Sequence, residues 1–180
     1  MRFRVRRSSE VFRGRVFRLV NQDVVLPGGR EAVFNIVEHP GAVALVPVFD
    51  DGDVLLLKQF RPAARASLYE IPAGTREPGE SPRVTALREL IEETGYAARR
   101  LRKIAEFYTA PGFCTERMHL YVATGLRERP GADQDEDEVI RTVRMPFRRA
   151  LRMAYGGQVR DAKSIVGLLL AWRALNGGAP

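Results

Sequence analysis

The sequence predicts an α+β protein, an α/β/α sandwich in which a mixed β-sheet lies between helices and a small β-rich segment precedes it. Strand-like segments outnumber helical ones, two short turns join strand-like segments as hairpins, and a continuous apolar run is typical of a buried strand. The chain has 180 residues, enough for one domain with a small appendage and a core of its own.

The N-terminal part alternates between polar and apolar side chains in the manner of strands. Residues 15–20 show this alternation, and Pro27-Gly28-Gly29 supplies a turn before another strand-like segment at 32–37. We therefore divide the chain into a β-rich segment, residues 1–40, and a main domain, residues 41–180.

The main domain begins with a strand hairpin and continues with a capped helix. The apolar run 42–49 is followed by the turn Asp50-Asp51-Gly52 and a returning strand at 54–60. Ser81-Pro82 predicts the start of a helix that ends where Gly95 follows Thr94. Further strands are expected at 104–108, 118–124 and 139–145, and further helices at 147–155 and 162–175.

The composition excludes several classes of protein. It is 45% hydrophobic and 28% charged, which is ordinary for a soluble globular chain. The single cysteine, Cys114, excludes an internal disulfide framework and fits a reducing compartment. The longest apolar runs have eight residues, whereas a membrane-spanning helix needs about 20. We therefore expect a cytoplasmic protein that does not span a membrane.

The net charge of +7 comes almost entirely from arginine. Residues 1–30 hold eight arginines and residues 141–160 hold six. Because arginine binds phosphate in a bidentate manner, this excess favours a phosphate-bearing partner. A nucleic acid is not favoured as that partner, since no aromatic-interleaved strand, zinc pattern or helix-turn-helix accompanies the charge.

Carboxylates gather on the predicted helix that follows Ser81. Glu89 and Glu93 are four residues apart and Glu92 is three residues after Glu89, so the three lie on the same general face. Like charges at this spacing destabilise a helix by a few tenths of a kcal/mol per pair. A hard divalent cation such as Mg²⁺ relieves that repulsion and takes oxygen ligands. Taken alone, an acidic helix face is more often merely solvated.

The spacing of the whole segment around these glutamates favours a metal site over a merely solvated helix face. In the segment from Gly74 to Tyr96, GTREPGESPRVTALRELIEETGY, seven positions are fixed by the spacing. At a background frequency of about 7% each, they coincide by chance in roughly one chain of this length in a million. They are Gly74, Glu80, Arg88, Glu89, Glu92, Glu93 and Gly95.

This pattern resembles the signature of the Nudix hydrolases and departs from it only at the last place, where Tyr96 stands for an aliphatic residue. The resemblance implies the Nudix fold. The flanking segments resemble the ADP-ribose pyrophosphatase branch of that family, including Pro111, sixteen residues after Gly95. The other matching segments are residues 38–43, 59–62, 68–74, 109–113, 135–138 and 161–164.

The resemblance implies hydrolysis of a nucleoside diphosphate linked to another group, with Mg²⁺ as cofactor and Mn²⁺ as an alternative ion. The metal ligands that it implies are Glu89, Glu93, Glu138 and the carbonyl of Ala73. Arg88 orients the helix glutamates, and Glu92 contacts the metal directly or through water. The general base is Glu136 or Glu138.

The resemblance also implies residues that bind the substrate. Arg61 is the candidate for its phosphates, Glu116 for a ribose hydroxyl, and Glu70 for a further contact. At Phe34 many relatives carry an arginine that reaches the substrate. Phenylalanine cannot bind phosphate, so we expect Phe34 to stack on a purine.

We therefore expect an Mg²⁺-dependent enzyme that cleaves ADP-ribose to AMP and ribose 5-phosphate. Its small-molecule substrate is a nucleoside diphosphate sugar, with GDP-mannose as the alternative to ADP-ribose. A non-catalytic nucleotide-sensing domain and an RNA-processing pyrophosphohydrolase are less favoured. The resemblance also implies a homodimer in which residues 1–40 help to complete the partner's substrate site.

Overall fold

The chain divides into two compact units in the computed structural model, which describes residues 3–129 and 140–177. The N-terminal unit comprises Met1–Gly41 and Phe107–Met118, and the main unit comprises Ala42–Glu106 and His119–Pro180. Strands β8 and β9 run from one unit into the other.

The elements confirm the α+β class. In chain order they are β1 (Arg4–Arg13), β2 (Arg18–Val25), β3 (Glu31–Glu38), β4 (Ala42–Val48), β5 (Asp53–Arg61), the short 3₁₀ helix η1 (Pro62–Ala64), β6 (Ala66–Glu70), β7 (Ala73–Thr75), α1 (Pro82–Thr94), β8 (Tyr96–Tyr108), β9 (Arg117–Glu128), β10 (Ile140–Pro146), α2 (Phe147–Tyr155) and α3 (Ala162–Asn176).

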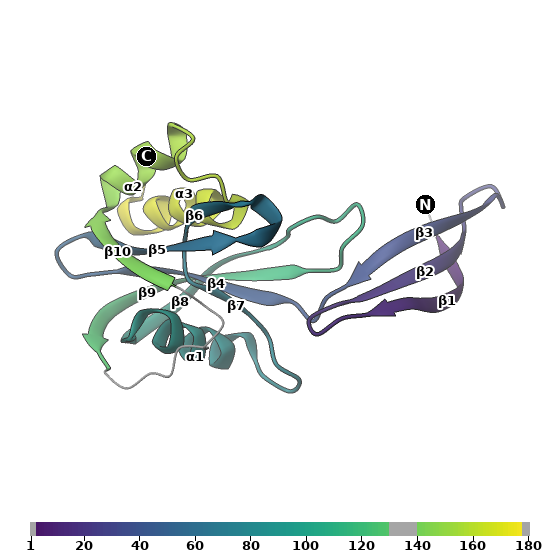
Figure 1. Cartoon of the computed structure of the whole chain (residues 1–180), viewed down its shortest axis with the longest axis horizontal. Coiled ribbons are helices and arrows are strands. Elements are labelled where there is room, and N and C mark those ends of the chain that lie inside the picture. The colour runs from purple at the N-terminus through teal and green to yellow at the C-terminus, as the bar shows by residue number, and fades with distance from the viewer. Residues whose placement is uncertain (1–2, 130–139, 178–180) are drawn as a thin grey trace. The chain divides into compact units, whose positions relative to one another are not determined.

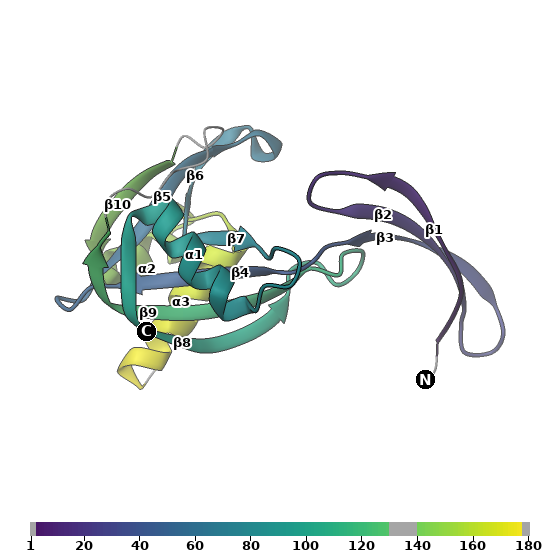
Figure 2. The same ribbon diagram turned by 90° about the horizontal axis from the view of Figure 1, so that it is seen from below.

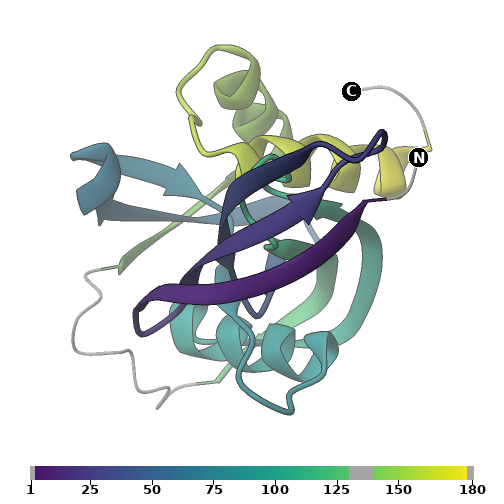
Figure 3. The same ribbon diagram turned by 90° about the vertical axis from the view of Figure 1, so that its right-hand side faces the viewer.

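The N-terminal unit holds a three-stranded sheet in the order β1-β2-β3, with antiparallel pairs (Figures 1 and 3). The predicted turn between β2 and β3 is present, and Gly28 and Gly29 take φ angles of +93° and +86°. Only glycine adopts such angles without steric cost, so these residues determine where the hairpin turns. Val20 and Val24 of β2 are buried.

The main unit is built on a seven-stranded sheet in the order β10-β5-β4-β9-β8, with β6 paired to β5 and β7 to β4. Helix α1 covers one face, and α2 and α3 cover the other (Figures 1 and 2). Because both faces are covered, all seven residues of β4 are buried, which explains its continuous apolar sequence. No helix among the described residues is long and apolar enough to span a membrane.

A core forms on each face of this sheet. On the α1 face, Leu90 packs in a buried cluster with Val43, Leu45, Ala86, Tyr121 and Ala123. Burying a side chain such as Leu90 contributes about 1.5–3 kcal/mol. On the other face, a Cβ at Gly167 of α3 would lie 2.5 Å from Cδ1 of Ile71. The absence of a side chain at Gly167 therefore lets α3 lie close to the segment between β6 and β7.

The sequence predictions were wrong for part of the strand content. Strand β8 starts at Tyr96 rather than at residue 104, and β6 and β7 were not anticipated. β8 lies at the end of the strand order, and its first half is rich in arginine and alanine. An edge strand tolerates charged side chains, so it carries no alternating apolar pattern there. β6 and β7 have only five and three residues, too few for a periodic signal.

Candidate active site

The box from Gly74 to Gly95 folds as strand β7, a loop and helix α1. The Ser81 side chain accepts a hydrogen bond from the Val84 amide at 3.3 Å, and Pro82 occupies the first turn. Gly95 ends the helix with φ +73°, and its amide donates to the Ile91 carbonyl at 2.8 Å. Both predicted ends of α1 are confirmed, because the signals that set them are local.

Glu93 joins helix α1 to strand β7. Its side chain is buried, at 6% exposure, and its Oε2 accepts a hydrogen bond of 2.8 Å from the amide of Ala73. Ala73 is the residue whose carbonyl was predicted to bind a metal. The hydrogen bond therefore places two of the predicted ligands, the Glu93 carboxylate and the Ala73 peptide, next to each other.

Glu89 lies directly over Gly74. A Cβ built on Gly74 would be only 1.9 Å from both Cδ and Oε1 of Glu89. A glycine is therefore required at the start of the box, because any side chain at position 74 would occupy the place of the Glu89 carboxylate. Glu89 and Glu93 both reach β7 from one face of α1, as their spacing predicted.

Arg88 is the cation at the centre of the helix carboxylates. Its guanidinium lies 3.2 Å from Glu80, 2.9 Å from Glu89 and 2.7 Å from Glu92, and it donates to the Thr75 carbonyl at 3.4 Å. Burial by itself lowers the pKa of Arg88, but the hydrogen bond to Glu80 and the charges of Glu89 and Glu92 outweigh it and raise the pKa above its ordinary value. Arg88 therefore stays charged and holds these side chains together.

Glu80 is fixed in the loop before α1. The hydrogen bond from Arg88 lowers the pKa of this carboxyl group, burial opposes the change, and the Thr85 hydroxyl, 2.9 Å from Oε2, adds to it. Arg76 donates to the Glu80 carbonyl at 2.7 Å. These contacts make Glu80 an ionised anchor between the loop and the helix.

The charges of the box favour a hard divalent cation. Three carboxylates, Glu80, Glu89 and Glu92, pair with the single guanidinium of Arg88, and the Glu93 carboxylate lies against Ala73. Glutamate and backbone carbonyl oxygens are the donors that Mg²⁺ prefers. Among the described residues, no three acidic, histidine or cysteine side chains already form a cluster spaced for an ion. The oxygen donors thus fit a cation chemically. In the structure Arg88 pairs with Glu89 and Glu92, and the Ala73 amide donates to Glu93.

A second network of charges lies beside the box and centres on Glu70. Arg61 forms a bidentate pair with its carboxylate, with both N–O distances 2.8 Å, and Lys163 of α3 contacts the same group. Burial raises the pKa of Glu70, but the hydrogen bond from Arg61 and the charge of Lys163 outweigh it and hold the pKa below its ordinary value. Arg61 and Glu70 were predicted to bind substrate. In the structure the charged groups of these two residues pair with each other. A contact of either residue with the substrate stays a prediction.

The first residues of α3 extend this network to the strand that carries Ala73. Asp161 caps the helix by accepting a hydrogen bond of 2.9 Å from the Ser164 amide, and the Ser164 hydroxyl donates to Asp161. The oxygen of that hydroxyl accepts from the Ile71 amide at 2.8 Å. The chain between β6 and β7 is thereby held from α3, two residues before Ala73. The helix cap formed by Asp161 and Ser164 can be recognised from their spacing in the sequence. The hydrogen bond from Ile71 to Ser164 cannot.

Replacing Glu70 by Gln tests the Glu70 network. The change removes the anion that Arg61 and Lys163 share, but Arg61 is 38% exposed and Lys163 keeps Asp161 at 3.1 Å, so we expect a cost of about 1–3 kcal/mol. Because the pKa of Glu70 is lowered by folding, its contribution is complete above the ordinary value near 4.5 and is lost as pH falls through the folded pKa. We expect urea unfolding to show a large gap between wild type and Glu70→Gln at pH 7 and a smaller gap at acid pH.

Glu128→Gln is the matched control, because Glu128 is exposed and the same charge is removed. Its unfolding free energy should change by less than about 0.5 kcal/mol. A gap between wild type and Glu70→Gln that stays constant with pH would contradict the ionised state of Glu70.

The comparison with known families bears on the box directly. Residues 38–165 match the family described as NUDIX domain. This stretch covers more than half of the 180 residues and includes the whole Glu80–Glu93 arrangement. The chain belongs to the Nudix family. The resemblance of the Gly74–Tyr96 spacing is thus confirmed, and Nudix proteins generally use a divalent metal.

Several Nudix proteins are similar to this one over most of their length. An ADP-ribose pyrophosphatase of Bacillus subtilis (strain 168) is 44% identical over 158 residues, covering 87% of this chain and 85% of its own. An ADP-ribose pyrophosphatase of Mycobacterium tuberculosis (strain ATCC 25618 / H37Rv) is 36% identical over 175 residues, covering 96% and 84%. A GDP-mannose pyrophosphatase of Salmonella arizonae (strain ATCC BAA-731 / CDC346-86 / RSK2980) is 38% identical over 135 residues, covering 70% of each chain.

The Nudix fold is also found by structural similarity. A crystal structure of an ADP compounds hydrolase matches with a TM-score of 0.86 at 25% identity, covering 98% of this chain and 96% of that one. The match extends over nearly all of the chain, so it includes the N-terminal sheet as well as the Nudix box.

Two of the predicted substrate residues belong to the N-terminal unit of this Nudix chain. Phe34 lies on β3 opposite Gln22 and is 40% exposed. Glu116 accepts a hydrogen bond of 2.6 Å from the Thr109 hydroxyl, and its Oε1 lies 3.7 Å from Nδ1 of His39. The roles proposed for Phe34 and Glu116 in substrate binding stay predictions.

The remaining predicted residues, Glu136 and Glu138, lie outside the described residues. Sequence reasoning missed Lys163 as a partner of Glu70, although it had noted the segment 161–164 as similar to relatives. The sequence does not indicate that Lys163 pairs with Glu70, because the two residues are 93 positions apart in the chain.

Proposed function

We propose that this chain hydrolyses the pyrophosphate bond of ADP-ribose to AMP and ribose 5-phosphate with Mg²⁺ as cofactor. The observation that carries the proposal is the placement of Glu89 and Glu93 against the Ala73–Gly74 peptide, held by Arg88. The substrate follows from two ADP-ribose pyrophosphatases that are 44% and 36% identical over most of the chain.

In this proposal Glu89, Glu93, Glu138 and the carbonyl of Ala73 hold the metal. When bound, Mg²⁺ neutralises the pyrophosphate charge and lowers the pKa of the attacking water. Arg88 keeps Glu89 and Glu92 in place through its ion pairs, so it positions the site rather than contacting the substrate.

The chemistry needs one acid to take the proton of the water. The water oxygen forms a new bond to one phosphorus atom, the bond from that phosphorus to the bridging oxygen breaks, and the bridging oxygen leaves on the other phosphate. We assign the general base to Glu136 or Glu138, and Glu92 contacts the metal directly or through water. On the substrate side, Arg61 serves the phosphates, Glu116 a ribose hydroxyl and Phe34 the adenine.

A comparison of substrates tests this proposal. The purified chain is given ADP-ribose, GDP-mannose and a 5′-triphosphorylated RNA with Mg²⁺, and released nucleotide is measured. We expect kcat/KM for ADP-ribose to exceed that for GDP-mannose by about tenfold or more, because the relatives that are similar over most of this chain include two ADP-ribose pyrophosphatases. Removal of divalent ions with EDTA should abolish turnover, and added Mg²⁺ should restore it.

GDP-mannose is the second candidate because a GDP-mannose pyrophosphatase is 38% identical to this chain, although over 135 residues only. A higher kcat/KM for GDP-mannose would replace ADP-ribose in the proposal. Nucleotide binding without hydrolysis of any of these compounds would instead indicate a nucleotide-sensing domain.

We further propose that the chain acts as a homodimer through its N-terminal sheet. Large apolar side chains are exposed on both faces of this sheet, as Val5 at 53% and Val33 at 63% show. A three-stranded sheet cannot cover such residues by itself, and an exposed apolar surface of this kind favours a protein partner.

The Val5→Glu/Val33→Glu variant tests the dimer. Glutamate at these two positions should shift the sedimentation coefficient from dimer to monomer and raise KM for ADP-ribose, since an interface that buries two charges is destabilised. Tyr155→Glu is the control, because Tyr155 is 65% exposed on α2. A wild-type chain that sediments as a monomer and is active at nanomolar concentration would contradict the shared site.

A further inference from the structure

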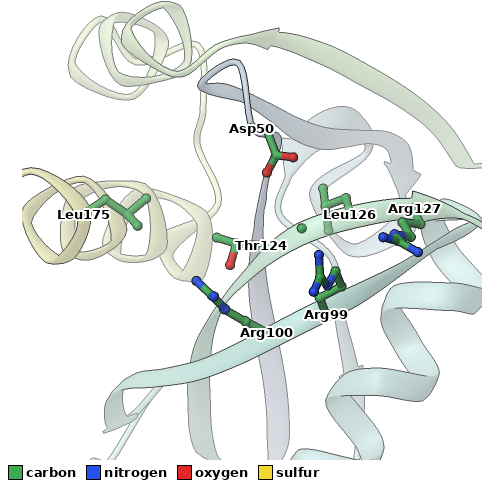
Figure 4. Close-up of a pocket in the computed structure, with 8 residues that line it drawn as sticks. Asp50, Arg99, Arg100, Thr124, Leu126, Arg127 and Leu175 are labelled. Atoms are coloured by element: carbon green, nitrogen blue, oxygen red, sulfur yellow. The ribbon is translucent and has the colours of Figure 1, made fainter.

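The main unit has a pocket whose residues the proposed reaction does not use. It is a pocket of about 490 Å³ lined by strands β8 and β9, the turn after β4 and the end of α3. Its lining residues are Asp50, Arg99, Arg100, Thr124, Gly125, Leu126, Arg127 and Leu175 (Figure 4). None of them belongs to the Gly74–Gly95 box or to the Glu70 network. A pocket of this volume suits a small molecule of nucleotide size.

Three arginines give this pocket its chemistry. Arg99 and Arg100 come from β8 and Arg127 from β9, and Figure 4 shows Asp50 across the pocket from them. None of the three forms an ion pair or a hydrogen bond through its side chain with any residue in the described part of the chain. Three arginines face one acid, Asp50, among the described residues that line the pocket, and because like charges repel one another this excess of positive charge favours a negatively charged ligand.

The neighbouring arginines behave differently. Arg83 donates to the Leu101 carbonyl at 3.0 Å, and Arg102 donates to the Ala174 carbonyl at 2.8 Å. Both guanidinium groups are therefore used to hold elements of the fold together. The three arginines of the pocket are not used in this way, although they lie on or beside the same strand.

Arg99 is also held in position by the backbone beneath it. Gly125 takes a φ of +65°, and a Cβ built on it would lie 3.1 Å from Cβ of Arg99 and 3.4 Å from its Cγ and Cδ. The stem of Arg99 thus rests on the glycine, which limits the directions its guanidinium can take. A partly ordered guanidinium loses less entropy when it binds an anion.

We propose that this pocket binds the phosphate group of a small phosphorylated molecule. Arg99, Arg100 and Arg127 bind the phosphate oxygens by charge-assisted hydrogen bonds, and the Thr124 hydroxyl adds a donor. Asp50 accepts from a hydroxyl of the ligand, so a sugar phosphate or a nucleotide fits the lining better than inorganic phosphate does. The site is separate from the proposed catalytic one and does not depend on it.

Isothermal titration calorimetry on the full chain tests this site. Inorganic pyrophosphate, ribose 5-phosphate and AMP are titrated in EDTA at about 0.15 M salt, where long-range attraction between exposed charges is largely screened. We expect binding to wild type and a Kd at least about tenfold higher for Arg99→Gln/Arg127→Gln, because charge-assisted hydrogen bonds are lost. Arg100→Gln alone should weaken binding in the same direction.

The control is Arg149→Gln/Arg160→Gln, which removes the same charge from two exposed arginines outside the pocket. Its Kd should stay within about twofold of wild type. Weaker binding of ribose 5-phosphate and AMP, but not pyrophosphate, in Asp50→Asn would identify a sugar phosphate, and equal effects on all three would identify a plain phosphate site.

Four results would overturn the proposal. They are no binding to wild type, equal binding to wild type and Arg99→Gln/Arg127→Gln, equal losses in both double variants, and binding of single-stranded RNA but of none of the small phosphates. Equal binding to wild type and Arg99→Gln/Arg127→Gln would place the ligand in the catalytic site. Equal losses in both double variants would show that only net charge matters. Binding of RNA alone would indicate a nucleic-acid surface. Circular dichroism melts of each variant check that the fold is unchanged.

Discussion

Replacing Glu93 by Gln should leave the fold intact and lower kcat by at least about a hundredfold. The amide oxygen of Gln can still accept the hydrogen bond from the Ala73 amide, so the link between α1 and β7 persists. The site loses one negative charge, which weakens both the binding of Mg²⁺ and the activation of water. Steady-state kinetics across a range of Mg²⁺ concentrations and a thermal melt separate these effects.

Glu77→Gln is the matched control for this variant. Glu77 is an exposed carboxylate in the same box, three residues before Glu80, and it was assigned no role. Its kcat and Mg²⁺ dependence should equal those of wild type. Normal turnover of Glu93→Gln at saturating Mg²⁺ would remove Glu93 from the metal site.

Replacing Gly74 by Ala should inactivate the enzyme without unfolding it. The new methyl group would lie 1.9 Å from the Glu89 carboxylate, whereas carbon contacts settle near 3.5 Å. The end of a glutamate side chain moves at little cost, so Glu89 yields and the fold remains. Its carboxylate leaves its place against the strand by about 1 Å or more, a displacement that can lower turnover by about a hundredfold.

Two measurements distinguish this outcome from simple destabilisation. The melting temperature of Gly74→Ala should lie close to that of Gly112→Ala, where a Cβ meets nothing within 4 Å. The Mg²⁺ concentration for half-maximal rate should rise only in Gly74→Ala. A variant with normal kcat would show that the carboxylate of Glu89 is not needed in this position.

Helix α1 illustrates what can be predicted from the sequence. Its start at Ser81, its end at Gly95 and the common face of Glu89 and Glu93 all depend on residues within a few positions of one another. Local signals of this kind are readable without tertiary information. The spacing therefore predicted the acidic face of the site as well as the helix.

The contacts that were missed connect distant parts of the chain. Lys163 meets Glu70 across 93 positions, and no pattern around either residue indicates the other. Gly74 was recognised by its spacing. The reason for a glycine there, the Glu89 carboxylate in the place that a Cβ would take, is visible only when helix and strand are placed together. Strand β8 was predicted too short because arginines at a sheet edge leave no apolar alternation.

The hydrogen bond between Ser164 and Ile71 has a consequence for the order in which the enzyme is made. The ribosome releases Ile71 and the whole Gly74–Gly95 box long before Ser164, which lies 93 residues later. At about 5–20 residues per second, that interval lasts roughly 5–20 s. During this time the peptide leading to Ala73 lacks its anchor on α3, and β7 is held by its pairing with β4 and by the hydrogen bond from Ala73 to Glu93. An incomplete chain therefore carries every residue of the box without the contact from α3 that completes the support of the ligand-bearing strand.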